Sequence, residues 1–182
     1  MPDISIRKAA TEDAPVLRDL IREAMESYRK DSGIPEGLLE SLKESVESVA
    51  YRIEHNNCLC LLSDGTIVGT VTLTMSSNPV RYSFSDYTEE VLSEFGMSGY
   101  ISRLAVADEA RKTGLGVLLM KTVLSEAAKA GASHALLHTA VSNRRMKDFY
   151  FSLGFRLLDS EHSRGYERGL FVTDITPSES HI

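Results

Sequence analysis

The stretch that decides the fold is GYISRLAVADEARKTGLGVLLMKTVLSEAAKAG, residues 99–131. Residues 100–106 are rich in β-forming and apolar side chains, and the polar residues 108–112 predict a loop after that strand. Apolar residues then recur at three- and four-residue spacing, as in a helix with one buried face: Leu115, Leu118, Leu119, Val123 and Ala127. Gly131 stands where a left-handed helix cap would fall. The stretch therefore predicts a strand, a tight turn and a long helix.

The turn contains Gly114-Leu115-Gly116 and opens the helix directly. A helix that begins on such a turn points its unpaired N–H groups and the positive end of its dipole into one concavity, which suits a phosphate. Two other phosphate motifs fail on spacing. A dinucleotide fingerprint needs glycine or alanine at position 119, where the chain has Leu119, and a Walker loop needs Gly-Lys-Ser/Thr, whereas Met120 precedes Lys121-Thr122. The spacing therefore argues against nucleotide hydrolysis.

Composition narrows the class of protein. The chain has 182 residues, of which 42% are hydrophobic, and a net charge of −6. We expect a single domain over residues 1–175, followed by a loose tail at 176–182. No block of lysine and arginine stands out, so we expect no nucleic-acid binding. The N-terminus lacks a basic-then-apolar signal, and no stretch approaches the ~18 apolar residues of a membrane span, so we expect a cytoplasmic protein without a membrane partner.

The two cysteines, Cys58 and Cys60, lie two positions apart in an apolar, strand-like run. Both would face the same side of a strand and could not readily bridge. Two cysteines also fall short of the ligand count of a zinc site. We expect structural thiols and no metal.

The rest of the chain shows alternating strand and helix patterns. Before the central stretch they predict a strand at 4–7, a helix from Thr11-Glu12-Asp13 to Gly33, a second helix from Pro35 to Asn56 and a hairpin over 58–75 that turns at Asp64-Gly65. Residues 76–98 are a loop-like insertion with a short helix around Val91 and Leu92. After the central stretch the patterns predict a strand at 134–141, a helix at 143–153 and a last hairpin after Gly154. This order predicts an α/β fold with a mixed, mostly antiparallel sheet flanked by helices.

Two motifs make a family resemblance specific. Arg111-Lys112-Thr113-Gly114-Leu115-Gly116 matches the acyl-CoA loop Arg/Gln-x-x-Gly-x-Gly/Ala, and residues 143–155, NRRMKDFYFSLGF, match Asn-x(5)-Phe-Tyr-x-x-Leu-Gly-Phe. The chain resembles a GNAT-superfamily N-acetyltransferase. With the preceding strand the motifs cover residues 99–155, and the first 98 residues match in layout only.

The resemblance implies a role for each motif residue. The backbone N–H groups of Arg111, Lys112, Thr113, Gly114, Leu115 and Gly116 would hold the pyrophosphate of acetyl-CoA. The strand residues Leu104, Ala105 and Val106 would pair with pantetheine, and the Val106 N–H would polarise the thioester carbonyl. Asn143 would bond to the cofactor arm, although a plain helix cap would look the same.

Tyr150 would act as the general acid. Its ordinary pKa of ~10 lies above the ~8.5 of a thiol, so the phenol keeps its proton until charge develops on the leaving sulfur. A packing aromatic is the alternative. The base stays open, because the strand 99–104 has no carboxylate where many family members place a glutamate; the candidates are His138, Asp86, Glu89 and Glu90.

The implied reaction is direct transfer of acetyl from acetyl-CoA to a primary amine of a small molecule or peptide. Ser102-Arg103-Leu104 resembles a GNAT-like branch that uses long-chain acyl carrier protein, but Tyr100 stands where the lactone synthases of that branch have glutamate. A plain salt-bridge role for Arg103 and a non-catalytic acyl-CoA sensor are further alternatives. The acidic composition mildly favours a cationic acceptor. A homodimer through the terminal hairpin or the sheet edge is also left open.

Overall fold

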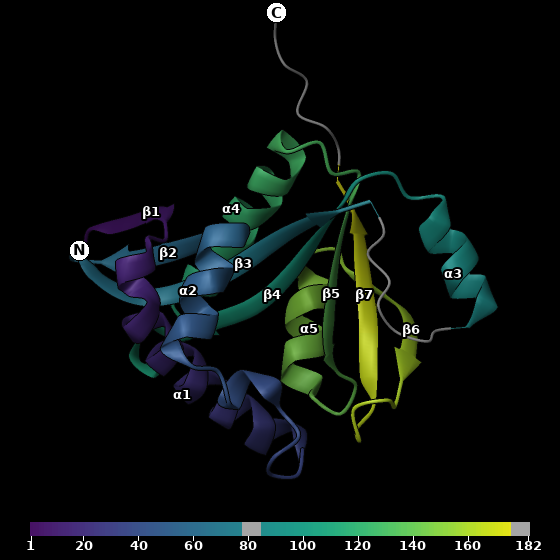
Figure 1. The fold of residues 1–182 in the computed structure, drawn as a ribbon, viewed down its shortest axis with the longest axis horizontal. Coiled ribbons are helices and arrows are strands. Elements are labelled where there is room, and N and C mark those ends of the chain that lie inside the picture. Colours follow the sequence, from purple (N-terminus) through teal and green to yellow (C-terminus); the bar gives the residue numbers. More distant parts are fainter. Residues whose placement is uncertain (78–84, 176–182) are drawn as a thin grey trace, which may run out of the picture. The chain divides into compact units, whose positions relative to one another are not determined.

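The computed structural model describes residues 1–77 and 85–175. The expected tail at 176–182 and residues 78–84 of the expected insertion lie outside the described residues. The helices and strands, shown in Figure 1, are β1 (Ile4–Lys8), α1 (Ala14–Ser32), α2 (Val46–His55), β2 (Asn57–Ser63), β3 (Thr66–Ser76), α3 (Asp86–Ser93), β4 (Ser98–Val106), α4 (Leu115–Lys129), β5 (His134–Ala140), α5 (Arg144–Ser152), β6 (Arg156–Glu161) and β7 (Arg168–Asp174).

The strands follow the order β1-β2-β3-β4-β5-β7-β6 in one sheet. The pairs β1–β2, β2–β3, β5–β7 and β6–β7 are antiparallel, whereas β4 and β5 run parallel. The prediction of a mixed, mostly antiparallel sheet with flanking helices is therefore confirmed.

Contacts group the chain into two compact units, which are described separately. The first unit contains Met1–Thr74 and Ser102–Val123, and the second contains the remaining described residues. Strands β3 and β4 and helix α4 contribute residues to both. A single domain over residues 1–175 stays a prediction.

In the first unit, β2 and β3 form the predicted hairpin. Its turn residues Asp64 and Gly65 both have positive φ, 49° and 78°, as a two-residue type I′ turn requires. Helices α1 and α2 pack against β2 through a core that joins all three elements: Ala14, Leu17, Val49, Ile53, Cys58 and Cys60. Both thiols are free and buried, which agrees with the structural role predicted for them.

The second helix begins later than predicted. It starts at Val46 rather than Pro35, and Ser45 caps it by accepting a hydrogen bond from the Ser48 N–H at 3.1 Å. Gly37 has a φ of 85°, which breaks any helix begun at Pro35, and only a short 3-10 turn follows at Glu40–Leu42. The apolar residues before Ser45 therefore belong to a connection between helices.

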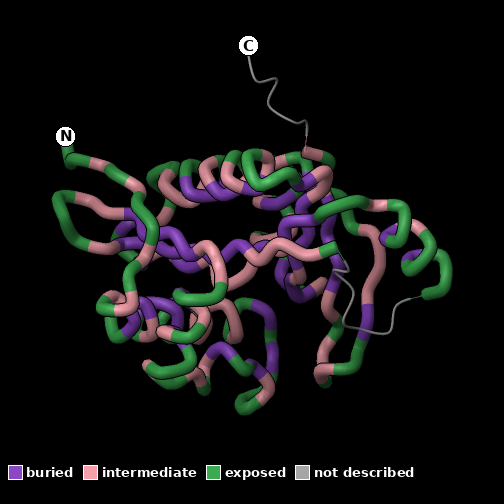
Figure 2. Tube along the Cα trace, turned by 45° about the horizontal axis from the view of Figure 1, so that its top comes forward, coloured by how far each residue is buried: buried purple, intermediate pink, exposed green. Residues whose placement is uncertain are grey.

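In the second unit, β5 lies between β4 and β7. The short helix predicted within the insertion forms as α3, whose Leu92 packs against Leu136, Leu170 and Val172 of the strands. The last hairpin is β6–β7, as predicted. Figure 2 shows that buried residues gather in the strands and on one side of the helices. In the part of the chain that the structure describes, no helix is long and apolar enough to cross a bilayer.

Helix α4 ends as predicted, with Gly131 in a left-handed conformation at φ 91°. Its buried face differs from the prediction, because Met120 is buried in place of Leu118 and Leu115 is only half-buried. Leu119, Met120, Val123 and Ala127 are fully buried, whereas Leu118 is 41% exposed. At 100° per residue Met120 points in the direction that the other three share, and Leu118 points away from it.

Candidate functional site

The loop 111–116 joins β4 to α4 in the first unit. Lys112 and Gly114 have positive φ, 60° and 83°, with Thr113 between them. A loop that contains such left-handed residues can turn its backbone N–H groups toward one concave side, a geometry that binds anions. A Cβ at Gly114 would meet no protein atom within 4 Å. The glycine is therefore required by its backbone conformation rather than by crowding within the protein.

The start of α4 adds further donors to this loop. The Leu118 N–H makes the first hydrogen bond of the helix, to the Gly114 carbonyl at 3.0 Å. The N–H groups of Leu115, Gly116 and Val117 precede that bond, so they have no acceptor inside the helix. Together with the positive end of the helix dipole they favour a phosphate.

Arg111 holds the loop in place. Its Nε donates to the Val106 carbonyl at 3.2 Å, and its Nη1 donates to Ser27 Oγ and Asp108 Oδ1, both at 3.1 Å. The side chain thus ties the loop to the end of β4 and to α1. Lys112 is exposed, so its ammonium is the side-chain charge that the loop presents to solvent.

Strand β4 carries the predicted residues Leu104, Ala105 and Val106. Its parallel register with β5 runs from Ser98 to Tyr100, so these three residues lie beyond that ladder. Arg103 lies between the residues paired with β5 and Leu104, and its φ of 54° interrupts the extended conformation of the strand.

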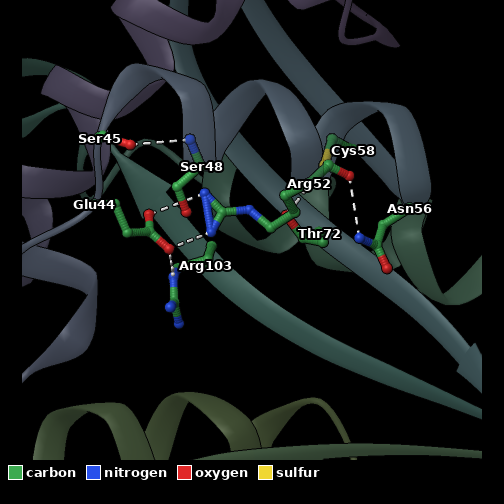
Figure 3. A network of polar contacts seen from close by, with 8 residues as sticks. All are labelled: Glu44, Ser45, Ser48, Arg52, Asn56, Cys58, Thr72 and Arg103. Atoms are coloured by element: carbon green, nitrogen blue, oxygen red, sulfur yellow. Dashed lines mark hydrogen bonds and ion pairs between the residues drawn. The ribbon is translucent and has the colours of Figure 1, made fainter.

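The side chains of Glu44, Arg52 and Arg103 form what we call the arginine network (Figure 3). Both Nη atoms of Arg52 donate to the two oxygens of Glu44, at 2.5 and 2.9 Å, and Arg103 Nε donates to Oε1 at 3.0 Å. The Glu44 side chain is only 10% exposed. Burial lowers the pKa of Arg52, and the charge of Glu44 opposes that shift. Because both of its oxygens accept from guanidinium groups, Glu44 is a poor candidate for the base.

Sequence reasoning missed Glu44. It stands in an irregular connection before α2, where an acidic residue carries no signal, and it contacts an arginine 59 positions away. Only the fold brings these residues together.

Asn143 and Tyr150 lie in the second unit. Asn143 is buried, and its Oδ1 accepts a hydrogen bond from the Met146 N–H at 3.0 Å, so it caps α5. Tyr150 is 6% exposed, and its ring packs against Phe149, Phe155 and Phe171 at centroid distances of 5.3, 5.8 and 6.3 Å. This packing holds the phenol in one orientation. The cofactor contact of Asn143 and the acid role of Tyr150 stay predictions.

The candidate bases differ in their surroundings. His138 Nδ1 lies 2.6 Å from the Tyr100 hydroxyl, and burial lowers the His138 pKa to about 3. At neutral pH this imidazole is uncharged and a weak proton acceptor. Asp86, Glu89 and Glu90 are exposed on α3. Within residues 1–77 and 85–175, no group of three His, Cys, Asp or Glu side chains is placed to hold a metal ion.

The structure thus groups the predicted site residues in two sets. Leu104–Val106 and the loop 111–116 belong to the first unit, and Asn143 and Tyr150 belong to the second. Within the first unit, Arg111 joins the strand end to the loop.

A comparison with models of protein families identifies the family. The family model described as "Acetyltransferase (GNAT) family" matches residues 17–155. No curated protein sequence matches the chain significantly.

Solved structures share the fold at low sequence identity. The PaiA N-acetyltransferase of Thermoplasma acidophilum, solved with coenzyme A, has 21% identity and a TM-score of 0.74, with 94% of this chain and 99% of that one covered. The ribosomal-protein-S18-alanine N-acetyltransferase of Escherichia coli has 16% identity and a TM-score of 0.69, with 99% of each chain covered. YncA of Salmonella typhimurium, a putative acetyltransferase solved with acetyl-CoA, has 13% identity and a TM-score of 0.69, with 96% and 95% covered.

Proposed function

Because the chain belongs to the GNAT acetyltransferase family, we propose that it transfers an acetyl group from acetyl-CoA to a primary amine of a small molecule or peptide. The observation that carries the proposal is the loop 111–116, whose left-handed residues and adjoining helix start present several backbone N–H donors. Two solved proteins of this fold contain coenzyme A or acetyl-CoA, which supports this choice of donor.

In this proposal the loop 111–116 and the strand residues Leu104–Val106 both bind acetyl-CoA. The N–H groups of Arg111 to Gly116 bind the pyrophosphate, and Lys112 adds a positive charge. Leu104, Ala105 and Val106 lie beyond the β4–β5 ladder and offer their backbone to pantetheine as a neighbouring strand would. The Val106 N–H polarises the thioester carbonyl and stabilises the oxyanion that forms on it.

The reaction begins when the neutral amine attacks the thioester carbonyl. The tetrahedral intermediate collapses, the C–S bond breaks, and the electron pair stays on sulfur. Tyr150 donates its proton to that sulfur, and the proton that the acetylated nitrogen loses returns through water to the Tyr150 phenolate. Asn143 holds the cofactor arm from the start of α5. The products are the N-acetylated amine and free CoA.

The amine loses its proton to water in this proposal, because β4 carries no carboxylate and His138 is a weak acceptor. At pH 7 a lysine-like amine of pKa ~10.4 must be neutralised at a cost of about 4.6 kcal/mol, whereas an α-amine of pKa ~8 costs about 1.4 kcal/mol. Amines of low pKa are therefore the better acceptors.

A panel assay tests the proposal. Free CoA release is measured with acetyl-CoA and with long-chain acyl donors, including acyl carrier protein, against amines, polyamines, amino acids and peptides. Turnover with acetyl-CoA is expected. Preference for a long-chain donor would favour acyl transfer of that kind, and tight acetyl-CoA binding without turnover would favour a sensor. The proposal places the enzyme in the cytoplasm.

A further inference from the structure

Arg103 has an unusual backbone for its position. It is one of three residues other than glycine with positive φ in the described ranges, and the other two, Asp64 and Lys112, stand in a turn and a loop. Arg103 alone of these three lies inside a strand. A left-handed conformation costs such a residue about 1–2 kcal/mol, so the fold holds Arg103 there against its own preference.

The arginine network carries excess positive charge. One carboxylate, Glu44, faces two guanidinium groups. Arg52 already donates to both Glu44 oxygens, so Glu44 is satisfied without Arg103. A plain salt bridge to Glu44 therefore accounts for only part of what Arg103 does.

The Arg103 guanidinium is held at its Nε atom. Its Nε donates to Glu44, and neither Nη atom has a hydrogen-bond partner among residues 1–77 and 85–175. Figure 3 shows these two nitrogens pointing away from Glu44. The side chain is 29% exposed, so a ligand can reach it. Two parallel N–H donors on a planar group match the two oxygens of a carboxylate.

The two Nη groups of Arg103, which we call its guanidinium fork, lie next in sequence to residues proposed to take part in the reaction. Arg103 directly precedes Leu104, Ala105 and Val106, the residues proposed to hold the thioester. The bond from Nε to Glu44 orients the fork, so less side-chain entropy is lost when a ligand binds. Salt screens exposed charges that lie more than about 10 Å apart, so the net +1 of the network itself weighs most on a ligand at Arg103.

We propose that Arg103 binds a carboxylate of the acceptor, so that the preferred substrates are primary amines that carry a carboxylate group. This rests on the proposed function, because it assigns the acceptor of the same reaction. It reverses the preference for a cationic acceptor that the overall composition suggests, since the local charge at Arg103 is positive.

Matched acceptor pairs test the inference. In each pair one member carries a carboxylate and the other carries none: γ-aminobutyrate with butylamine, and glycylglycine with its amide. In wild type we expect kcat/KM to favour the carboxylate member by about ten- to a hundredfold, mainly through KM. In Arg103→Gln that preference disappears, whereas the KM for acetyl-CoA stays within about threefold. Arg103→Lys restores part of it, because lysine keeps the charge without the fork.

The control is Arg22→Gln, which removes an exposed arginine of the same unit and leaves the preference unchanged. Thermal melting of both variants shows whether they are folded. The inference is overturned if the carboxylate preference survives in Arg103→Gln. It is also overturned if Arg103→Gln raises the KM for acetyl-CoA instead of removing the carboxylate preference.

The two proposals fail separately. If wild type acetylates the amines that lack a carboxylate as well as it acetylates their carboxylate partners, the inference is wrong and the proposed function stands. If no amine is acetylated, the proposed function fails, and calorimetric titration with the N-acetylated carboxylates still decides the role of Arg103. Binding that is absent, or that is equal in wild type and Arg103→Gln, then overturns the inference as well.

Discussion

The loop 111–116 and the arginine network both present hydrogen-bond donors to an anion, and they do so by different means. The loop uses backbone N–H groups set by local conformation, at Lys112 and Gly114. The network uses side chains from three separate segments, held by Glu44. Donors set by consecutive residues are specified by short-range sequence, whereas donors on distant residues depend on the whole unit being folded.

The largest effect is expected outside both regions. Tyr150→Phe removes the proposed proton donor, so kcat should fall about a hundredfold or more while acetyl-CoA binding is retained. Steady-state kinetics together with calorimetric titration of acetyl-CoA measure the two quantities. Unchanged turnover would show that Tyr150 only packs against its neighbouring rings. This variant provides a defect in chemistry against which the two binding regions can be compared.

Glu44→Gln tests whether the network supports the fold. Replacing the carboxylate leaves the guanidiniums of Arg52 and Arg103 without their shared counter-ion, and Arg52 is only 14% exposed. The free energy of unfolding should drop by about 2 kcal/mol, as measured by denaturant titration. Glu54→Gln, which changes an exposed acid on α2, should stay within about 0.5 kcal/mol of wild type. Equal stability of all three proteins would contradict a supporting role.

Gly114→Ala tests the loop. The left-handed conformation at φ 83° should cost the alanine variant about 1 kcal/mol of stability, and the KM for acetyl-CoA should rise. Gly33→Ala is a matched control. Gly33 has a φ of 67° and also faces open space, but it caps α1 and does not belong to the loop 111–116. Both variants should lose similar stability in thermal melts. If the KM for acetyl-CoA rises equally in both, the loop is not the phosphate site.

The smallest effect concerns acid stability and involves neither region. Burial lowers the pKa of His138 from its ordinary 6.5 to about 3, so the unfolded chain takes up the proton first as pH falls. The stabilisation is complete above pH 6.5 and is lost as pH falls toward 3. Between pH 7.5 and pH 6 this loss amounts to about 0.8 kcal/mol.

His138→Gln removes that contribution. Denaturant titrations at the two pH values should show a flatter dependence for the variant than for wild type. His134, whose pKa burial also lowers, remains in both proteins and acts in the same direction. Parallel pH profiles for the two proteins would show that His138 is not responsible.

Local signals in the sequence predicted much of the fold. The positive φ values of Asp64 and Gly65 follow from the turn that this dipeptide favours, and Gly131 ends α4 for the same kind of reason. The predicted start of α2 was wrong because the apolar spacing after Pro35 resembles that of a helix. The positive φ of Gly37 prevents a helix there, and the cap at Ser45 sets the start at Val46.

The candidate site likewise contains residues that local sequence predicted and residues that it could not predict. The spacing of Arg111, Gly114 and Gly116 indicated the loop, since consecutive residues build it. Spacing could not indicate Glu44 or the orientation of Arg103, because tertiary contacts bring them together. The twofold use of Arg111, which binds Val106 and Ser27, was also invisible in the motif.

Those contacts of Arg111 have a kinetic consequence. Because the side chain fastens the loop to β4 and α1 within the folded chain, the loop loses its conformational freedom during folding rather than during binding. The donor then meets a preorganised surface, and its association rate is set by diffusion and orientation rather than by a closing motion. Stopped-flow traces of acetyl-CoA binding should accordingly show one phase whose rate rises linearly with acetyl-CoA concentration.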